Sequence, residues 1–278
     1  EIIQSAKTAI FFIDENQQVT IHDIGSLDEI RTWAEKAGAE VTEMTLASQF
    51  RCNGSDGYLA WVDDVLQIRE TANTDLIGID YDCQVFDDPN AIRQAIEALN
   101  EKNGKSRLVA GYCWEWRSKK DPKAQDVMIE EHDFAMRWNL TEDGPLWLVK
   151  PDSVSEVGCI HTCQGLELDY VGVIIGPDLV VRDGQVVTDA TKRARQDRSV
   201  FGFKKLHKEN PDEAALLADR IIKNTYRTLM TRGMKGCFIY ATDPETRDYF
   251  HDRLSVSGGR ALESQMPILK VAEDPERY

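Results

Sequence analysis

Two short groups near the start of the chain carry side chains that suit phosphate chemistry. Asp14-Glu15-Asn16-Gln17 follows the apolar run 7–13, and a glutamine in a loop after a parallel strand can donate to a phosphate or hold a water. In Gln49-Phe50-Arg51, the ring can stack on a base and the planar guanidinium can grip a phosphate. Taken alone, such groups are at least as common in solvated loops and over apolar cores.

A third group, residues 158–170, crowds small, polar and acidic side chains into one connection between two predicted strands. This composition is expected of a loop that approaches a ligand. Cys159, His161 and Cys163 alternate, so on a strand they would share one face. Zinc is therefore an open alternative, although a fourth ligand and the usual wider spacing are lacking, and buried thiols are the simpler expectation.

A fourth group, residues 226–236, places Arg227, Arg232 and Lys235 at the end of a predicted helix. Cations at this position complement the helix dipole, which is a purely structural role. They can equally point at the charge that develops on a phosphate during its transfer. The spacing alone leaves both roles open.

The elements that would position these groups alternate along the chain. We expect strands over 7–13, 107–113, 157–162, 170–175 and 236–241, and helices over 27–37, 58–66, 89–102, 211–232 and 244–254. Ser26 would cap the first helix and Gly38 would end it. A hairpin over 179–187 has Asp183-Gly184 at its tip. Alternation of strands and helices predicts an α/β fold with a mainly parallel sheet flanked by helices, and residues 115–145 predict a small β/loop insertion.

Composition narrows the class of protein. The chain has 278 residues and a net charge of −15, which excludes a uniformly basic nucleic-acid binder. Its apolar runs are too short to cross a bilayer, and it shows no secretory signal. Six cysteines without a CxxC pair indicate reduced thiols, so we expect a cytoplasmic protein with no membrane partner. Because it opens just before a predicted strand and without Met, we expect it to be part of a longer protein.

In this order the four groups resemble motifs III to VI of the superfamily 1 helicase-type P-loop ATPases. The chain is most similar to an uncharacterised bacterial branch related to the helicase-like region of Schlafen proteins, and the resemblance covers residues 7–250. The motif V match is the most specific, although Cys159 stands where Thr is common. The matches, from motif III to motif VI, are Asp14-x-x-Gln17, Leu46-x-x-Gln49-Phe50-Arg51, His161-x-x-Gln164-Gly165-Leu166-Glu167-x-Asp169 and Leu229-Met230-Thr231-Arg232.

The resemblance implies a RecA-like fold and a nucleotide site split between two domains. Residues 1–26 would be the trailing edge of a first RecA-like domain, 27–254 the second domain, and 255–278 a tail. ATP would lie between the domains, with Mg²⁺ held by the missing N-terminal half. As catalytic residues, Gln17 would sense the γ-phosphate, and Arg51 and Arg232 would reach it.

The remaining nucleotide contacts are also implied by the resemblance. Phe50 would stack on the base and Glu167 would contact the ribose. Their neighbours in the same motifs complete the predicted nucleotide-binding set: Asp14, Gln49, Gln164 and Gly165.

A phosphate loop is missing from the sequence. The nearest match to G-x-x-x-x-G-K-[S/T] is Gly104-Lys105-Ser106, but the first glycine would fall on Leu99, and a helix precedes it where a strand is needed. The chain alone is therefore predicted not to hydrolyse ATP, although the longer protein would be an ATP hydrolase or helicase. The alternative is a non-catalytic RecA-like scaffold that binds a partner, and a metal-dependent enzyme ranks last.

Basic residues gather between 192 and 208, with seven cations, one acid, and Phe201 and Phe203 interleaved. Charge with aromatic rings suits single-stranded DNA or RNA. A solvated helix, or a surface that meets the missing domain, fits equally well. The predicted nucleic-acid residues are His161, Thr162, Phe201, Phe203, Lys204 and Lys205. Trp114 and Trp116 form a second candidate for base stacking, although alternating tryptophans more often belong to a core.

Overall fold

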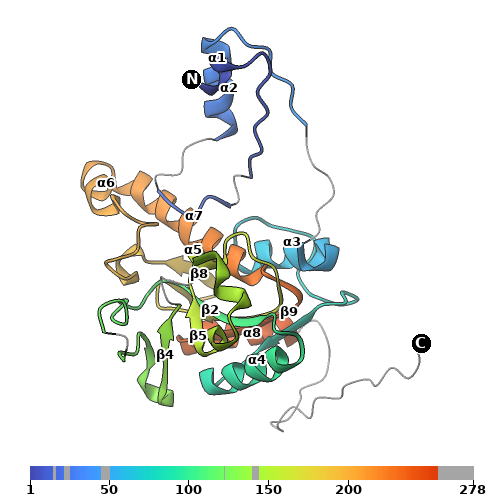
Figure 1. Ribbon diagram of the computed structural model, residues 1–278, viewed down its shortest axis with the longest axis vertical. Helices are drawn as coiled ribbons and strands as arrows, with labels where there is room; N and C mark the ends of the chain where they lie inside the picture. Colours follow the sequence, from blue (N-terminus) through green and yellow to red (C-terminus); the bar gives the residue numbers. More distant parts are fainter. Residues whose placement is uncertain (15–16, 22–25, 45–50, 122, 140–143, 256–278) are drawn as a thin grey trace.

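The computed structural model describes residues 1–14, 17–21, 26–44, 51–121, 123–139 and 144–255. Its centre is a seven-stranded sheet in the order β1-β9-β6-β2-β5-β4-β3 (Figure 1). All neighbours pair in parallel except β3 and β4. In sheet order the strands span Asp82–Val85, Gly233–Ala241, Leu168–Ile175, Ser106–Ala110, Glu156–Gly158, Phe134–Trp138 and Val127–Ile129.

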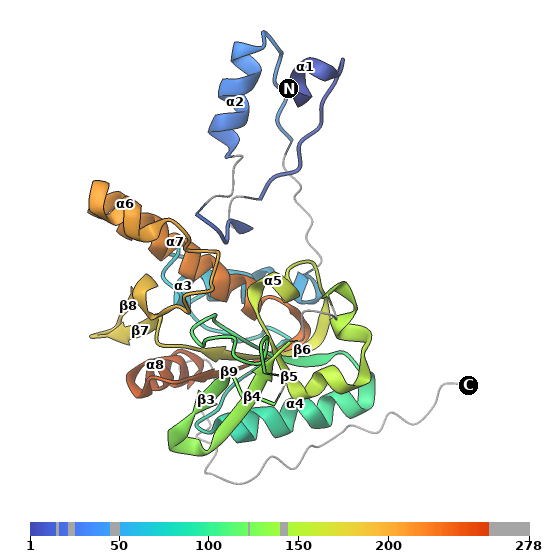
Figure 2. The ribbon, with the colours of Figure 1, turned by 60° about the vertical axis from the view of Figure 1, so that its left-hand side comes forward.

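Helices cover both faces of the sheet, as expected for a RecA-like α/β fold (Figure 2). In chain order α1 to α8 span Ile2–Ser5, Leu27–Lys36, Asp56–Val65, Pro89–Asn103, Ile160–Cys163, Phe203–Glu209, Pro211–Met230 and Pro244–Ser255. One core joins α3 and α7 to β6 and β9 through Trp61, Tyr226 and Val173. A second joins α4 and the β3–β4 insertion to the opposite face through Ile96, Phe134 and Ile174.

Most helix ends lie where the sequence predicts them, because local capping chemistry sets them. Ser26 and Glu29 form a reciprocal capping box at the start of α2. Gly104 ends α4 in the left-handed conformation, with φ of 67°. The helix-then-strand order around Gly104 confirms that this glycine belongs to a turn and not to a phosphate loop. Within the described residues, no helix is both long and apolar enough to cross a membrane.

The predicted hairpin and insertion are confirmed. β7 (Leu179–Arg182) pairs with β8 (Gln185–Thr188) in a separate two-stranded sheet. Asp183 and Gly184 both have positive φ, as a two-residue hairpin turn requires. The insertion contributes β3 and β4, of which β4 extends the main sheet beside β5.

The strand predicted over 7–13 is wrong. In the structure this segment is not a strand and belongs to an arm that stands away from the sheet together with α1 and α2 (Figures 1 and 2). Ile10 is 77% exposed and Phe12 is 86% exposed. An apolar run forms a strand only where a neighbour pairs with its backbone, and among the described residues none does.

The strand predicted over 157–162 is only half right, because β5 ends at Gly158. The next residues form the helical turn α5, in which the Thr162 and Cys163 amides both donate to the Cys159 carbonyl. Cys159 and Cys163 are therefore one turn of helix apart and do not alternate on a strand face. β5 pairs with β2 over only a few residues. The backbone groups beyond this short pairing find hydrogen-bond partners inside the helical turn instead.

Candidate functional site

The turn that joins α7 to β9, residues 230–233, contains Arg232 and is contacted from several distant parts of the chain. Its four successive carbonyls each accept a hydrogen bond from a different part of the chain. The donors, in order, are Tyr58 Oη (3.1 Å), Cys52 Sγ (3.8 Å), the Leu168 amide (3.0 Å) and Tyr81 Oη (2.9 Å). Every partner is buried or part of a strand, so the turn is held rigidly from all sides.

Arg232 lies inside this turn and is itself buried. Its Nε donates to the Thr228 carbonyl at 3.0 Å and its Nη1 to the Leu166 carbonyl at 3.4 Å. The first contact satisfies an orphan carbonyl at the end of α7, and the second ties the residues around Gly165 to the same helix. Arg232 therefore braces motif V against motif VI in this structure.

The 3₁₀ segment Arg51–Gly54, which begins at the last residue of the motif IV match and continues beyond it, reaches the turn. Cys52 and Asn53 have φ of 50° and 55°, in the left-handed region that non-glycine residues seldom occupy. The backbone therefore turns tightly here, and this turn places the Cys52 thiol within hydrogen-bond distance of the Thr231 carbonyl. Gln49 and Phe50 lie outside the described residues, and for Arg51 only the backbone is described.

Motif V runs from one edge of the sheet to the other. It leaves the carboxyl end of β5, crosses through α5, and reaches the amino end of β6. Gly165, with φ of 90°, makes the turn that a residue with a side chain would resist. Gln164 and Glu167 are exposed beside it. Asp169 has a structural role, since it pairs with Lys235 at 2.8 Å and accepts a hydrogen bond from Asn103.

Gln17 lies elsewhere, on the arm. Its Nε2 donates to the Asp14 carboxylate at 2.6 Å. The residues that follow anchor the arm to the domain: the Gln18 carbonyl accepts from Asn224 of α7, Val19 enters the core, and the Ile21 amide donates to the Ser199 carbonyl. The structure thus brings Cys52, Leu168 and residues 230–233 together, and it places Asp14 and Gln17 on a separate segment that reaches α7 at Asn224.

Residues 1–243 match the family model described as Schlafen group 3, DNA/RNA helicase domain. The chain belongs to this family. It is also similar to an uncharacterized protein of Saccharomyces cerevisiae, with 28% identity over 219 residues, which is 73% of this chain. The chain spans about half of that relative, 46% of its length. No solved structure gives a significant match.

The opposite, carboxyl edge of this Schlafen-type helicase domain holds a buried ion network. Arg193 pairs with Asp178 at 3.0 Å and with Asp197 at 3.1 Å, and all three side chains are fully buried. Tyr226 of α7 donates to Asp178 and accepts from the Gly176 amide at 2.9 Å. The network therefore ties the end of β6, the loop around residue 193 and α7 into one unit.

His161 joins the network from the surface. Its Nε2 lies 3.9 Å from Asp197, and its side chain is part exposed. Burial alone would raise the pKa of Asp197, but the contacts of His161, Arg193 and Ser199 hold that pKa below its ordinary value. Asp197 is thus a carboxylate that favours its charged form. Thr162, the other predicted motif V contact, has its hydroxyl 3.5 Å from the Cys159 thiol.

The basic stretch 192–208 divides into two sets. Arg193 is buried in the network, so it is wrong to count it among the surface cations. Lys204 and Lys205 are exposed on α6, and Phe201 is 70% exposed. Phe203 stacks on His207 with ring centroids 5.4 Å apart. Trp114 is part-buried against the second core, where its indole donates to the Met128 carbonyl.

The zinc alternative loses its geometric basis, because Cys159 and Cys163 are buried in and beside α5 and do not share a strand face with His161. Burial raises the pKa of Cys163 well above its ordinary value, which disfavours the thiolate that metals need. Across the part of the chain that the structure describes, no three His, Cys, Asp or Glu side chains cluster as metal ligands.

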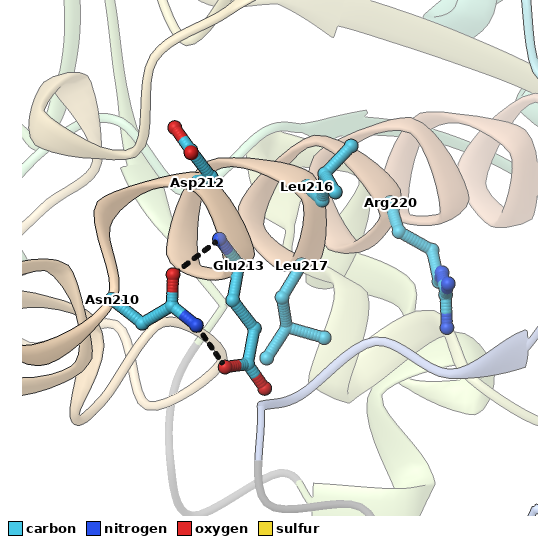
Figure 3. Close-up of a pocket in the computed structure, with 6 residues that line it drawn as sticks. All are labelled: Asn210, Asp212, Glu213, Leu216, Leu217 and Arg220. Carbon is cyan, nitrogen blue, oxygen red and sulfur yellow. Dashed lines mark hydrogen bonds between the residues drawn. The ribbon is translucent and has the colours of Figure 1, made fainter.

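A surface pocket of about 420 Å³ lies along the first turns of α7 (Figure 3). Its polar groups serve the helix, since Asn210 caps it by accepting from the Glu213 amide and donating to the Glu213 carboxylate. Leu216 and Leu217 supply its apolar side. None of the residues predicted from motifs III to VI lines it.

Sequence reasoning missed the network of Arg193, Asp178 and Asp197. One signal was present: Asp197 is the single acid inside a run of seven cations. An isolated acid in such a run is a candidate for an inward-facing partner. Asp178 could not be found this way, because it lies 19 residues before Asp197 and outside the basic run.

Proposed function

We propose that this chain is the C-terminal half of a helicase-like ATPase that supplies motifs III to VI and couples ATP hydrolysis to binding or remodelling of nucleic acid. The observation that carries the proposal is that Cys52, just after the motif IV match, and Leu168, within the motif V match, both bond to the turn at residues 230–233. Four elements hold this turn through its carbonyls, so a charge presented from it is well positioned.

In this proposal ATP and Mg²⁺ lie between the turn and a first RecA-like domain, which carries the phosphate loop and the magnesium ligands. Arg232 and Arg51 supply positive charge to the γ-phosphate, and Gln17 senses it from the arm. Phe50 and Glu167 contact the base and the ribose. Phosphoryl transfer depends mainly on positioning and electrostatics, so rigid placement of two arginines is the expected contribution of this half.

Coupling between nucleotide and nucleic acid follows from two elements that reach both edges of the sheet. α5 connects His161, at the carboxyl edge, to residues 165–168 at the amino edge. α7 carries Tyr226, which is part of the buried network, and ends at Met230, two residues before Arg232. A shift at either edge is therefore transmitted through packed elements to the other.

The test is ATP hydrolysis by the full-length protein with Arg232→Lys, which keeps the charge but loses the planar fork. We expect kcat to fall by about 10³-fold, the size of a lost arginine finger. Arg227→Lys is the matched control, because Arg227 lies five residues earlier, within α7, and pairs with Asp63 instead. If Arg232→Lys lowers only the melting temperature and leaves kcat unchanged, the role of Arg232 is purely structural and the proposal fails.

One observation favours a second candidate, a non-catalytic scaffold: Arg232 is buried and bonded to two backbone carbonyls. A scaffold would keep the hydrogen bonds of Arg232 to the two carbonyls for stability and would not bind a nucleotide. A labelled ATP analogue separates the two, since the full-length ATPase must bind it and the scaffold must not. Under either proposal we expect this chain alone to hydrolyse ATP more slowly than about 0.1 s⁻¹, far below a typical enzyme.

The nucleic-acid partner is proposed to be single-stranded DNA or RNA, bound near His161, Thr162 and α6. Lys204 and Lys205 are exposed there and Phe201 offers a ring for stacking. Reversing both lysines to glutamate should weaken binding of a single strand by the full-length protein, most of all at low salt. Binding that is unchanged by this reversal would remove α6 from the interface.

A further inference from the structure

The two basic segments that the sequence places 70 residues apart lie against each other in the fold. The Arg195 amide donates to the Glu115 carboxylate at 3.0 Å. The Trp116 amide donates to the Gln196 side chain at 3.4 Å. A third bond joins the Ala194 amide to the Tyr112 carbonyl. Loop 115–123, at the start of the insertion, therefore lies against residues 194–196 of loop 192–208, which runs on into α6 at Phe203.

Together the two loops carry ten exposed cations, which we name the composite basic surface. They are Arg117, Lys119, Lys120, Lys123, Lys192, Arg195, Arg198, Lys204, Lys205 and Lys208. Within these two loops, Asp121 is the one exposed acid among the described residues, while Glu115 is part-buried and holds the Arg195 amide. In a chain of net charge −15, this separation of charge marks a site for a polyanion.

A buried aspartate fixes each loop from beneath. Asp126 accepts bonds from the Arg117 amide at 2.6 Å, from the amide and hydroxyl of Ser118, and from the Trp138 amide. Asp197 holds the other loop, since it pairs with Arg193 and accepts a hydrogen bond from the Ser199 hydroxyl. Because both backbones are held inward, the exposed cations sit on loops that lose little backbone entropy on binding.

Aromatic rings lie within the same surface. Phe201 is 70% exposed, and Trp116 is part-buried with the Lys119 ammonium 5.7 Å from its ring centroid. A base can stack on an exposed ring beside a cation, whereas an acidic peptide gains nothing from it. His161 adds a third ring at the border, held at Asp197.

We propose that the composite basic surface binds one single strand of nucleic acid across both loops, with phosphates on the cations of loop 115–123 as well as on those of loop 192–208 and a base on Phe201. The proposal rests on the nucleic-acid part of the proposed function and deepens it. It makes the insertion, which has no counterpart among motifs III to VI, a part of the track for the strand.

The experiment measures fluorescence anisotropy of labelled oligo-dT and oligo-U, each of about 16 nucleotides, with the full-length protein over a range of salt. Lys119→Gln with Lys120→Gln should weaken binding about tenfold and make the slope of log affinity against log salt shallower by roughly 1.4, or about 0.7 for each lost phosphate contact. Lys36→Gln with Lys102→Gln, two exposed lysines on α2 and α4, should change neither value.

Phe201→Ala separates stacking from charge. It should weaken binding about tenfold while the salt slope stays that of the wild-type protein, because no ionic contact is lost. The assignment of a base to this ring would be overturned by either of two results. One is a changed salt slope in Phe201→Ala, and the other is an affinity equal to that of the wild-type protein.

These measurements can fail for the composite basic surface alone or for nucleic-acid binding altogether, and the two results differ. If no oligonucleotide binds the wild-type protein at low salt, both fail together. If Lys204→Gln with Lys205→Gln weakens binding but the Lys119 and Lys120 pair does not, the nucleic-acid function stands and the composite surface is refuted. Equal affinity for a polyglutamate peptide, or tighter binding of duplex than of single strand, would also refute it.

Discussion

Arg193 is the residue whose role changes most between sequence and structure. In the sequence it is one of seven cations in a basic run, and in the structure it lies between Asp178 and Asp197 with no exposed side-chain surface. A buried arginine between two carboxylates does not contribute to a surface field. It keeps two buried charges compensated, and removal of one partner from such a group is costly.

We therefore expect Arg193→Met to lower the free energy of unfolding by about 3–5 kcal/mol, because two buried carboxylates lose their counter-charge. Arg195→Met, two residues away and exposed, should change it by less than about 0.5 kcal/mol. Urea unfolding of the two variants makes the comparison. Similar losses in both would show that Arg193 is not the centre of the network.

A second residue-scale prediction concerns acid. Hydrogen bonds from Arg182, then from Thr246, lower the pKa of Asp243 from its ordinary value of 3.8 to about 2. A carboxyl group with a lowered pKa stabilises the folded state at neutral pH, and this contribution is lost as the pH falls from 3.8 to about 2. Asp243 is part-buried and its partner Arg182 is about half exposed, so solvent screening limits the contribution to about 1 kcal/mol.

Asp243→Asn keeps a capping side chain at the start of α8 but removes the charge. The variant should be slightly less stable at neutral pH, and its stability should fall less steeply between about pH 4 and pH 2. Asp248→Asn, an exposed acid on the same helix, is the control and should keep the wild-type acid profile. Unfolding midpoints in urea across this pH range give the answer.

At the scale of elements, the end of α7 and the start of β9 form the most constrained turn of the candidate site. Tyr58 from α3 and Tyr81 from the segment before β1 reach it by their hydroxyls, and their rings stack with centroids 3.8 Å apart. Gly233 is needed here for space, since a Cβ would lie 2.1 Å from the Gly236 carbonyl oxygen. The turn is built to keep one shape.

Tyr58→Phe removes the bond to the Met230 carbonyl and should cost about 1 kcal/mol. Tyr249→Phe is a matched control, because it removes a similar bond to the Val65 carbonyl away from the turn. Both variants should lose similar stability, but only Tyr58→Phe should raise KM for ATP in the full-length protein. Equal KM values would mean that the shape of the turn does not affect the nucleotide site.

At the scale of the whole molecule, the arm of residues 1–44 is the feature that the rest of the chain leaves uncovered. Ile10 and Phe12 are among its exposed apolar residues, whereas Val19, 2% exposed, anchors it in the core. Residues 7–13 have the apolar pattern of a buried parallel strand, but they are exposed in this structure. Such a surface is the kind that a first RecA-like domain would cover. The division of the chain near residue 26 stays a prediction, and α2, which follows that boundary, stands with the arm.

Ile10→Ser with Phe12→Ser should therefore leave the unfolding free energy of this chain within about 0.5 kcal/mol of wild type. Val19→Ala should lower it by roughly 2 kcal/mol, because it leaves a cavity in the core. In the full-length protein the paired serine variant should reduce ATP hydrolysis. A large loss of stability in the isolated chain would instead show that the arm packs on its own domain.

Local chemistry explains what the sequence by itself determined. Ser26 with Glu29, Gly104, and Asp183 with Gly184 set helix ends and a hairpin through bonds between near neighbours, and the alternation of elements indicated the parallel sheet. The order of motifs also pointed to the helicase-like family. Each of these signals acts over a few residues or is repeated along the chain, so no knowledge of distant contacts was needed.

Tertiary structure decided whatever depends on partners far apart in the sequence. The run 7–13 has the pattern of a strand but no partner strand among the described residues, so pattern alone misassigned it. Arg193 faces inward because Asp178 and Asp197 compensate it, and Arg232 turns onto Leu166 and Thr228. The union of loops 115–123 and 192–208 also depends on the fold, because hydrogen bonds between residues some 80 positions apart form only after the sheet has brought them together.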